Sequence, residues 1–200
     1  MSAPMSLPSP LDPLVEFYGS WNTGRAEDCL PLPLARAAKY ECLGGYLTTS
    51  PHAGSANSYG EFRLAALLDG PVRAAGLVPY GTVNLRFADD TWIQPELAVL
   101  REPAGGVTWV SPDQVLLLVE FAEGERHGQH RIDKPELCAH AGVPWYLRVE
   151  IDYPARSVYL RLSELVDGRY EERAAAGSGE RFRFAEPFAF DVDPAELLEP

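Results

Sequence analysis

The sequence lacks any apolar run close to the roughly 20 residues that a helix needs to cross a bilayer. Its opening residues, MSAPMSLPSPLDP, contain neither the basic start nor the apolar stretch of a secretory signal peptide. We therefore expect no membrane-spanning segment, no membrane partner and a cytoplasmic location. The Pro- and Ser-rich residues 1–10 are expected to form a disordered tail, and residues 11–200 a single domain with one core.

Cysteine and positive charge are also scarce. The three cysteines, Cys29, Cys42 and Cys138, include no CxxC pair, which argues against a zinc site and a disulfide framework. Cys138 falls among apolar positions of an expected helix, where a small core residue fits. The formal net charge is −12, so the protein gains no long-range attraction to nucleic acid or an anionic membrane. Only two of the 17 basic residues are lysines, a bias typical of GC-rich genomes.

Several common catalytic motifs are missing as well. The four histidines do not form HExxH or HxH spacing, which disfavours a metallopeptidase. The sequence has no GxSxG elbow, no GxxxxGK[ST] loop and no strand–GxGxxG–helix unit. Acyl transfer by that elbow and nucleotide binding of those two kinds therefore lack support.

What is present is a succession of strand-like and helical segments. Alternating or continuous apolar runs between turn residues predict strands at 39–43, 46–49, 74–78, 82–87, 96–100, 115–121, 145–151, 158–162, 169–173 and 181–184. Helical spacing and capping residues predict helices at 11–21, at 58–68, around Lys134 and from Asp193 onward. The sum is an α/β fold, with a mixed central sheet flanked by helices and an antiparallel C-terminal extension.

The helix expected at residues 58–68 has the apolar positions and the stop signal of a surface helix. Its predicted apolar face consists of Phe62, Ala65, Ala66 and Leu68. The sequence Asp69-Gly70-Pro71 is expected to end it, because proline removes a helix hydrogen bond.

The most informative segment is residues 115–150, a strand, a polar loop, a short helix and a second strand. Its first strand, VLLLVEF, is apolar except for Glu120. A carboxylate inside an apolar strand is costly unless something pairs with it. Glu120 is therefore a first candidate for a functional site.

Two further polar positions could complete such a site. Glu96 follows Pro95 at the head of the apolar strand ELAVL, and Lys134 lies on the helix 14 residues after Glu120. Carboxylates on neighbouring strands could share a divalent cation such as Mg²⁺, which prefers oxygen ligands and activates water. A nearby lysine could orient that water or stabilise charge on a phosphate. Glu41, in the strand KYECL, is a fourth candidate.

Structural explanations of the same residues stay open. Glu96 could face solvent at a strand end, and Glu120 could be paired with an arginine for structural reasons. Lys134 could be an ordinary solvated lysine. His130 lies four residues before Lys134 and could share one helix face with it, lining the site.

In these motifs the chain resembles the Uma family, whose members are described as restriction endonucleases, within the PD-(D/E)XK nuclease superfamily. The resemblance covers roughly residues 40–170. The segments that carry it are Pro95-Glu96, Leu118-Val119-Glu120, Lys134-Pro135, Ala141 through Tyr146, and Arg148-Val149-Glu150. Their order and spacing are more specific than any one of them alone.

The resemblance implies a restriction-endonuclease-like core and hydrolysis of DNA phosphodiester bonds with Mg²⁺ or Mn²⁺ as the cofactor. It implies that Glu96, Glu120 and Lys134 are catalytic. Glu96 and Glu120 would bind the metal, with Glu41 as a peripheral acidic ligand. A homodimer is also implied.

The chain departs from the family pattern at several positions. Glu96 stands where the family has Asp, His130 where its helix has Asp, and Asn57 where an upstream His is common. The turn Ala122-Glu123-Gly124 replaces a Val-Ser-Pro-like turn. These departures favour an alternative from another class, a catalytically impaired relative that acts as a binding or scaffold module.

Overall fold

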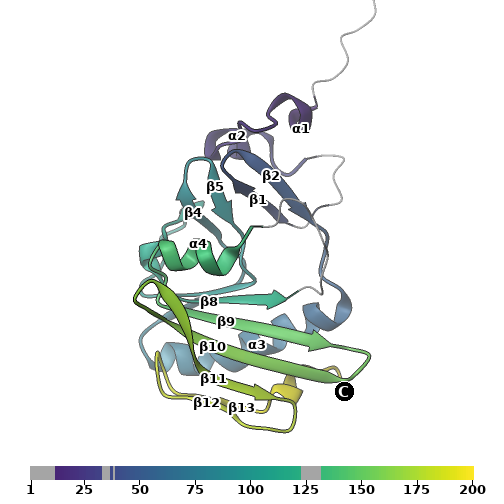
Figure 1. Ribbon diagram of the computed structural model, residues 1–200, viewed down its shortest axis with the longest axis vertical. Helices are drawn as coiled ribbons and strands as arrows, with labels where there is room; N and C mark the ends of the chain where they lie inside the picture. The colour runs from purple at the N-terminus through teal and green to yellow at the C-terminus, as the bar shows by residue number, and fades with distance from the viewer. Residues whose placement is uncertain (1–11, 33–36, 38, 123–131) are drawn as a thin grey trace, which may run out of the picture.

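The computed structural model describes residues 12–32, 37, 39–122 and 132–200. The expected tail at residues 1–10, His130 and the Glu123-Gly124 part of the departing turn lie outside these described residues. Within the described residues, no helix is long and apolar enough to cross a membrane. Figure 1 shows a mixed α/β architecture in which two larger sheets lie one above the other, with α4 at the level between them.

The larger sheet has six strands in the order β11-β10-β9-β8-β6-β3. Their bounds are β3 Val78–Tyr80, β6 Leu97–Leu100, β8 Val115–Ala122, β9 Trp145–Asp152, β10 Ser157–Val166 and β11 Arg169–Gly177. The pair β8–β9 is parallel and its other pairs are antiparallel. This confirms the mixed central sheet and its antiparallel continuation toward the C-terminus.

A second sheet has five strands in the order β2-β1-β5-β4-β7, and β12 pairs only with β13. The bounds are β1 Lys39–Leu43, β2 Tyr46–Ser50, β4 Asn84–Ala88, β5 Thr91–Ile93, β7 Trp109–Val110, β12 Phe182–Phe184 and β13 Phe190–Val192. The very short β5, β7 and β13 were not expected, because two or three residues are too few for a periodic signal. The N-terminal strands therefore do not join the central sheet.

One long helix, α3, and several short helices connect or cover these sheets. They are α1 Pro13–Glu16, α2 Thr23–Cys29, α3 Ser55–Ala74, α4 Lys134–His140 and the 3₁₀ helices η1 Pro112–Gln114 and η2 Pro194–Leu197. The helix predicted at residues 11–21 is shorter than expected, since Gly19 adopts a left-handed φ of 70°. The apolar residues beyond it pack as a pair of rings, Phe17 edge-on to Trp21 at 5.4 Å. The predicted terminal helix is the 3₁₀ turn η2, with Pro194 in first position.

Helix α3 differs from the prediction in both its end and its apolar face. It runs through Pro71 to Ala74, so residues 74–78 do not form the predicted strand and β3 begins only at Val78. The helix continues because fully buried Val72 extends the apolar row of Leu64 and Leu68 at four-residue spacing. That burial offsets the proline penalty of about 3 kcal/mol. Phe62, predicted to be buried, is 72% exposed.

The corrected face of α3 leads to a stability prediction. Replacing Leu64 by alanine is expected to lower the free energy of unfolding by about 2–5 kcal/mol, because the fully buried side chain leaves a cavity. Replacing exposed Phe62 by alanine is the matched control, with an expected change below about 0.5 kcal/mol. Urea denaturation measures both. Equal losses in the two variants would contradict this assignment of the helix face.

Strand β8 is central and has a different neighbour on each face. Leu117, Val119 and Phe121 belong to the core cluster that includes the buried residues of α3. Leu118 belongs to a second cluster with Cys138 of α4. Cys138 is fully buried, as its core interpretation predicted. Because strand residues alternate between faces, Glu120 shares the α4 side with Leu118.

Candidate active site

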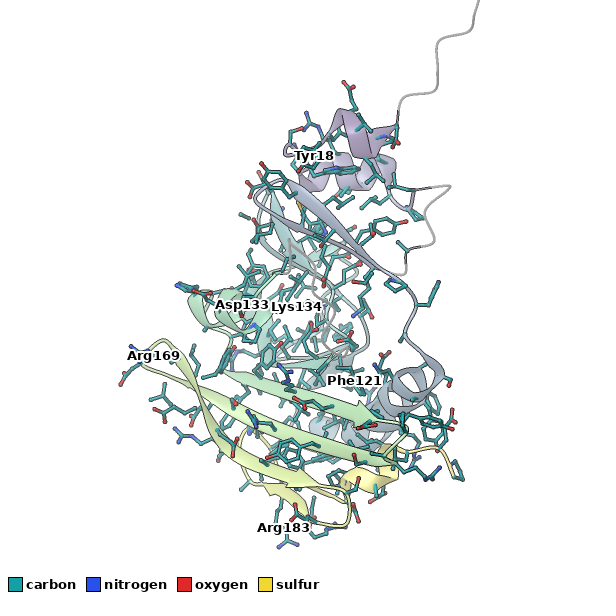
Figure 2. All side chains as sticks on the ribbon, turned by 45° about the vertical axis from the view of Figure 1, so that its right-hand side comes forward. Tyr18, Phe121, Asp133, Lys134, Arg169 and Arg183 are labelled. Atoms are coloured by element: carbon teal, nitrogen blue, oxygen red, sulfur yellow. The ribbon has the colours of Figure 1, made fainter. Side chains whose placement is uncertain are left out.

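Glu120 projects from the middle of the molecule into the space between β8, α4 and the second sheet. Only 8% of the residue is exposed. Figure 2 shows Lys134 at the start of α4 in the middle of the molecule, whereas Tyr18 and Arg183 lie toward opposite ends. The site is thus assembled where the two larger sheets face each other.

Glu96 immediately precedes β6 and lies beside Glu120. The β6–β8 register pairs Leu97 with Val119, so its antiparallel continuation sets Glu96 opposite Glu120. The Glu96 Oε2 atom accepts a hydrogen bond of 3.1 Å from the backbone N–H of Phe121. The Glu96 side chain is only 11% exposed, so the alternative in which Glu96 faces solvent at a strand end is wrong.

Glu41 reaches the same place from β1 of the other sheet. Its Oε1 atom accepts a hydrogen bond of 2.8 Å from the backbone N–H of Gln94. The Gln94 side chain is itself fixed, because its oxygen accepts from the N–H of Tyr40 at 2.7 Å and its amide donates to Asn84 Oδ1 at 2.7 Å. Gln94 lies two residues before Glu96. Its hydrogen bonds therefore connect the strand that carries Glu41 to the segment that carries Glu96.

Lys134 joins carboxylates from both sheets. Its Nζ atom lies 2.9 Å from Glu41 Oε1 and 2.8 Å from Glu120 Oε2. Lys134 is the first residue of α4, which Asp133 caps by accepting a 3.0 Å hydrogen bond from the N–H of Glu136. A cation is unfavourable near a helix N-terminus, so the two carboxylates hold it there. Glu120 is thus paired with a lysine and not with an arginine, and Lys134 is not solvated.

Lys39 is a fifth member of the cluster that the sequence analysis missed. It lies two residues before Glu41 in β1, and its Nζ atom forms an ion pair with Glu96 Oε1. Its side chain is 17% exposed, close to the 18% of Lys134. Two signals could have found it. Lysine is rare in this chain, and i, i+2 spacing on a strand places Lys39 and Glu41 on one face.

The pKa values of Glu120 and Lys134 are both raised, but for different reasons. Burial raises the pKa of Glu120 to about 8; Lys134 counteracts this, while Glu96 and Glu41 add to it. Burial alone would lower the pKa of Lys134, but attraction to Glu120 and Glu41 and hydrogen bonds with both raise it above its ordinary value. Lys134 therefore stays protonated at neutral pH and can act as a cation but not as a base.

One atom of the cluster is incompletely satisfied. Among the described residues, Glu120 Oε1 is the buried side-chain oxygen that has no hydrogen-bond partner. An unpartnered buried oxygen costs about 1–3 kcal/mol, and such an atom is where a hard cation would gain most. The donor set, carboxylate oxygens only, suits Mg²⁺ or Mn²⁺.

The present arrangement holds ammonium groups at these carboxylates. No group of three His, Cys, Asp or Glu side chains within the described ranges is already spaced to hold a metal ion. The donor chemistry of these carboxylates fits a divalent cation, whereas their spacing with the lysines in place does not, and Glu120 Oε1 is the oxygen available without rearrangement.

The fold and this cluster define a class, a mixed α/β protein with a restriction-endonuclease-like core. A crystal structure titled as a "putative nuclease belonging to DUF820" from Anabaena variabilis ATCC 29413 shares this fold. It has a TM-score of 0.51 and 14% identity, and the match covers 77% of this chain and 83% of that one.

The family itself follows from the sequence match. A family model described as "Uma2: Putative restriction endonuclease" matches residues 26–194, so the chain belongs to the Uma2 family. No curated protein matches the chain. The family resemblance read from residues 40–170 is thus confirmed, and it extends beyond them at both ends.

Proposed function

We propose that this protein is a divalent-metal-dependent DNA endonuclease, with Mg²⁺ or Mn²⁺ as its cofactor. Membership of the Uma2 family supports the nuclease class and DNA as the substrate. The single observation that carries the proposal is the buried cluster in which Glu120 keeps an unpartnered oxygen beside Lys134. A homodimer, implied by the same resemblance, stays a prediction.

In this proposal the four side chains have different roles. Glu120 and Glu96 bind the metal, and Glu41 orients Lys134 and is the peripheral acidic ligand. When bound, a divalent cation would acidify a coordinated water and stabilise negative charge on the phosphate. Lys134 positions the attacking water or stabilises the charge that develops on the phosphate, since its raised pKa keeps it protonated.

The experiment is cleavage of supercoiled plasmid DNA with Mg²⁺ or Mn²⁺. Replacing Glu120 by glutamine keeps the size of the side chain but removes the anionic ligand, so cleavage is expected to fall by more than about 100-fold. Glu171→Gln is the control, because this glutamate lies on the edge strand β11 with a 54% exposed side chain. Its cleavage should equal that of the native chain.

Cleavage that persists in Glu120→Gln would contradict the proposed site. No cleavage by the native protein with either metal would contradict the proposed activity.

One observation favours a second candidate, a scaffold or binding protein that retains the fold. Two lysines already neutralise Glu41, Glu96 and Glu120 in part, which stabilises the cluster without a metal. Calorimetric titration separates the two candidates. The endonuclease binds Mg²⁺ or Mn²⁺ at millimolar concentration, whereas the scaffold binds neither.

A further inference from the structure

The chain contains only two lysines among 17 basic residues, and both lie in this cluster. Elsewhere the ion pairs of the described residues use arginines with largely exposed side chains. The exposed ion pairs of the described residues are therefore formed by arginine, and those of the cluster by lysine. Lysine differs from arginine in carrying a compact point charge on a flexible stem, a common device for binding phosphate.

We propose that Lys39 is a substrate-contacting residue that binds a non-bridging phosphate oxygen of the nucleic acid, and that Glu96 holds it in place in the free protein. The proposal rests on the proposed endonuclease function and adds a residue to it.

The first argument is the way Glu96 is held. One of its oxygens accepts from the backbone N–H of Phe121, and the other is paired with Lys39. The backbone donor is fixed in β8, where Phe121 pairs with Val149 of β9, whereas the lysine stem is flexible. If Glu96 serves as a metal ligand, the contact that it gives up is the one with Lys39.

The second argument is the environment of the ammonium group that this exchange releases. The Lys39 side chain is only 17% exposed, and a buried charge without a partner is costly. Its strand neighbour Glu41 already bonds both Lys134 and the N–H of Gln94 through Oε1, so a second ammonium group at Glu41 would be repelled by Lys134. The released ammonium group therefore needs an anion, which a phosphodiester supplies.

The third argument is the net charge of the site. Metal binding requires Glu120 to be ionised, and in that form three carboxylates and two ammonium groups leave one net negative charge before the metal is counted. A divalent cation changes this to one net positive charge, which a single phosphodiester group neutralises. Without Lys39 the metal-loaded cluster would be neutral overall, and its attraction for phosphate would be weaker.

The test compares Lys39→Gln with the native chain in two binding assays. Calorimetry without DNA is expected to show Mn²⁺ bound at least about fivefold more tightly, because the competing ammonium group at Glu96 is gone. Fluorescence anisotropy with a short labelled DNA duplex and Ca²⁺ is expected to show DNA bound more weakly. The slope of log K against log salt should fall by about one, as expected for one lost phosphate contact.

Arg73→Gln is the charge-matched control. Arg73 lies on α3, on the opposite face of the six-stranded sheet from Glu120, with a 64% exposed side chain. Its metal affinity and salt slope should be unchanged. Lys39→Arg should restore most of the salt slope, and Lys39→Met replaces Lys39→Gln if the glutamine variant does not fold by circular dichroism.

If the Lys39→Gln and Lys39→Met variants both keep the salt slope of the native chain, the proposed role of Lys39 is wrong. Cleavage by the native chain would then still support the endonuclease function. A merely structural lysine would weaken metal and DNA binding together, and that result would also overturn the proposed role of Lys39. Absence of metal binding and cleavage in the native chain would overturn the endonuclease function and this role with it.

Discussion

Replacing Lys134 by methionine is expected to lower the free energy of unfolding by about 3–5 kcal/mol at about pH 8, and to reduce DNA cleavage by at least about 100-fold. The side chain connects Glu41 and Glu120, which are 6% and 8% exposed. Methionine fills similar space but leaves buried Glu41 without its cation, and Glu120 must take up a proton to stay buried. Urea denaturation and the plasmid assay measure the two losses.

The double variant Lys134→Met, Glu120→Gln is the control for this interpretation. It removes the lysine and one of the two carboxylates that would be left unpaired, so it should recover part of the stability but none of the cleavage. A loss below about 1 kcal/mol in the single variant would show an exposed pair that contributes little to stability.

Replacing Glu120 by glutamine is expected to stabilise the metal-free protein, by an amount that depends on pH. The Glu120 pKa is raised from 4.5 to about 8 in the folded chain. The folded state therefore binds this proton more tightly than the unfolded state, so the ionisation of Glu120 destabilises the fold. This penalty is absent below about pH 4.5, grows as the pH rises, and is complete above about pH 8.

Glutamine cannot ionise and escapes this penalty. Since one pKa unit corresponds to about 1.4 kcal/mol, the full shift sets an upper limit of about 5 kcal/mol. In EDTA, we expect the free energy of unfolding of the variant to exceed that of the native chain by about 1–5 kcal/mol near pH 8. This difference should shrink toward zero near pH 5. Urea denaturation at both pH values measures it. A difference independent of pH would show that the charge of Glu120 is not its cause.

Mg²⁺ should stabilise the native chain and have little effect on the Glu120→Gln variant. A ligand at about 100 times its Kd stabilises the fold by about 2.7 kcal/mol. The native chain should gain this stability with Mg²⁺ and the Glu120→Gln variant should gain little. Destabilisation by the ionised Glu120 carboxylate and stabilisation by the proposed cofactor would then both originate from one buried group.

The segment at residues 115–150 was the part of the site most readable from sequence. Glu120 interrupts a continuous apolar strand, and β8 and β9 form almost as predicted. The pair Glu120–Lys134 joins residues only 14 apart within one strand–helix unit. Local patterns report such a pair because the burial of the strand makes an unpaired charge costly.

The rest of the cluster depends on contacts that no local pattern contains. Lys39 and Glu96 are 57 positions apart, and they meet only because β1 belongs to a second sheet that faces the first. The apolar face of α3 was predicted incorrectly for the same reason. Whether Phe62 or Leu64 is buried depends on what the helix packs against.

The sequence by itself determined the fold class, the family and two of the functional candidates, since apolar periodicity and motif order are local properties. Only the tertiary structure decided that Glu41 shares Lys134 with Glu120, that Glu96 is partly buried, and that Lys39 belongs to the site. The physical reason is that strand pairing and the facing of two sheets are set by the burial of the whole core. The partners of a buried charge follow from that burial and not from its neighbours in the chain.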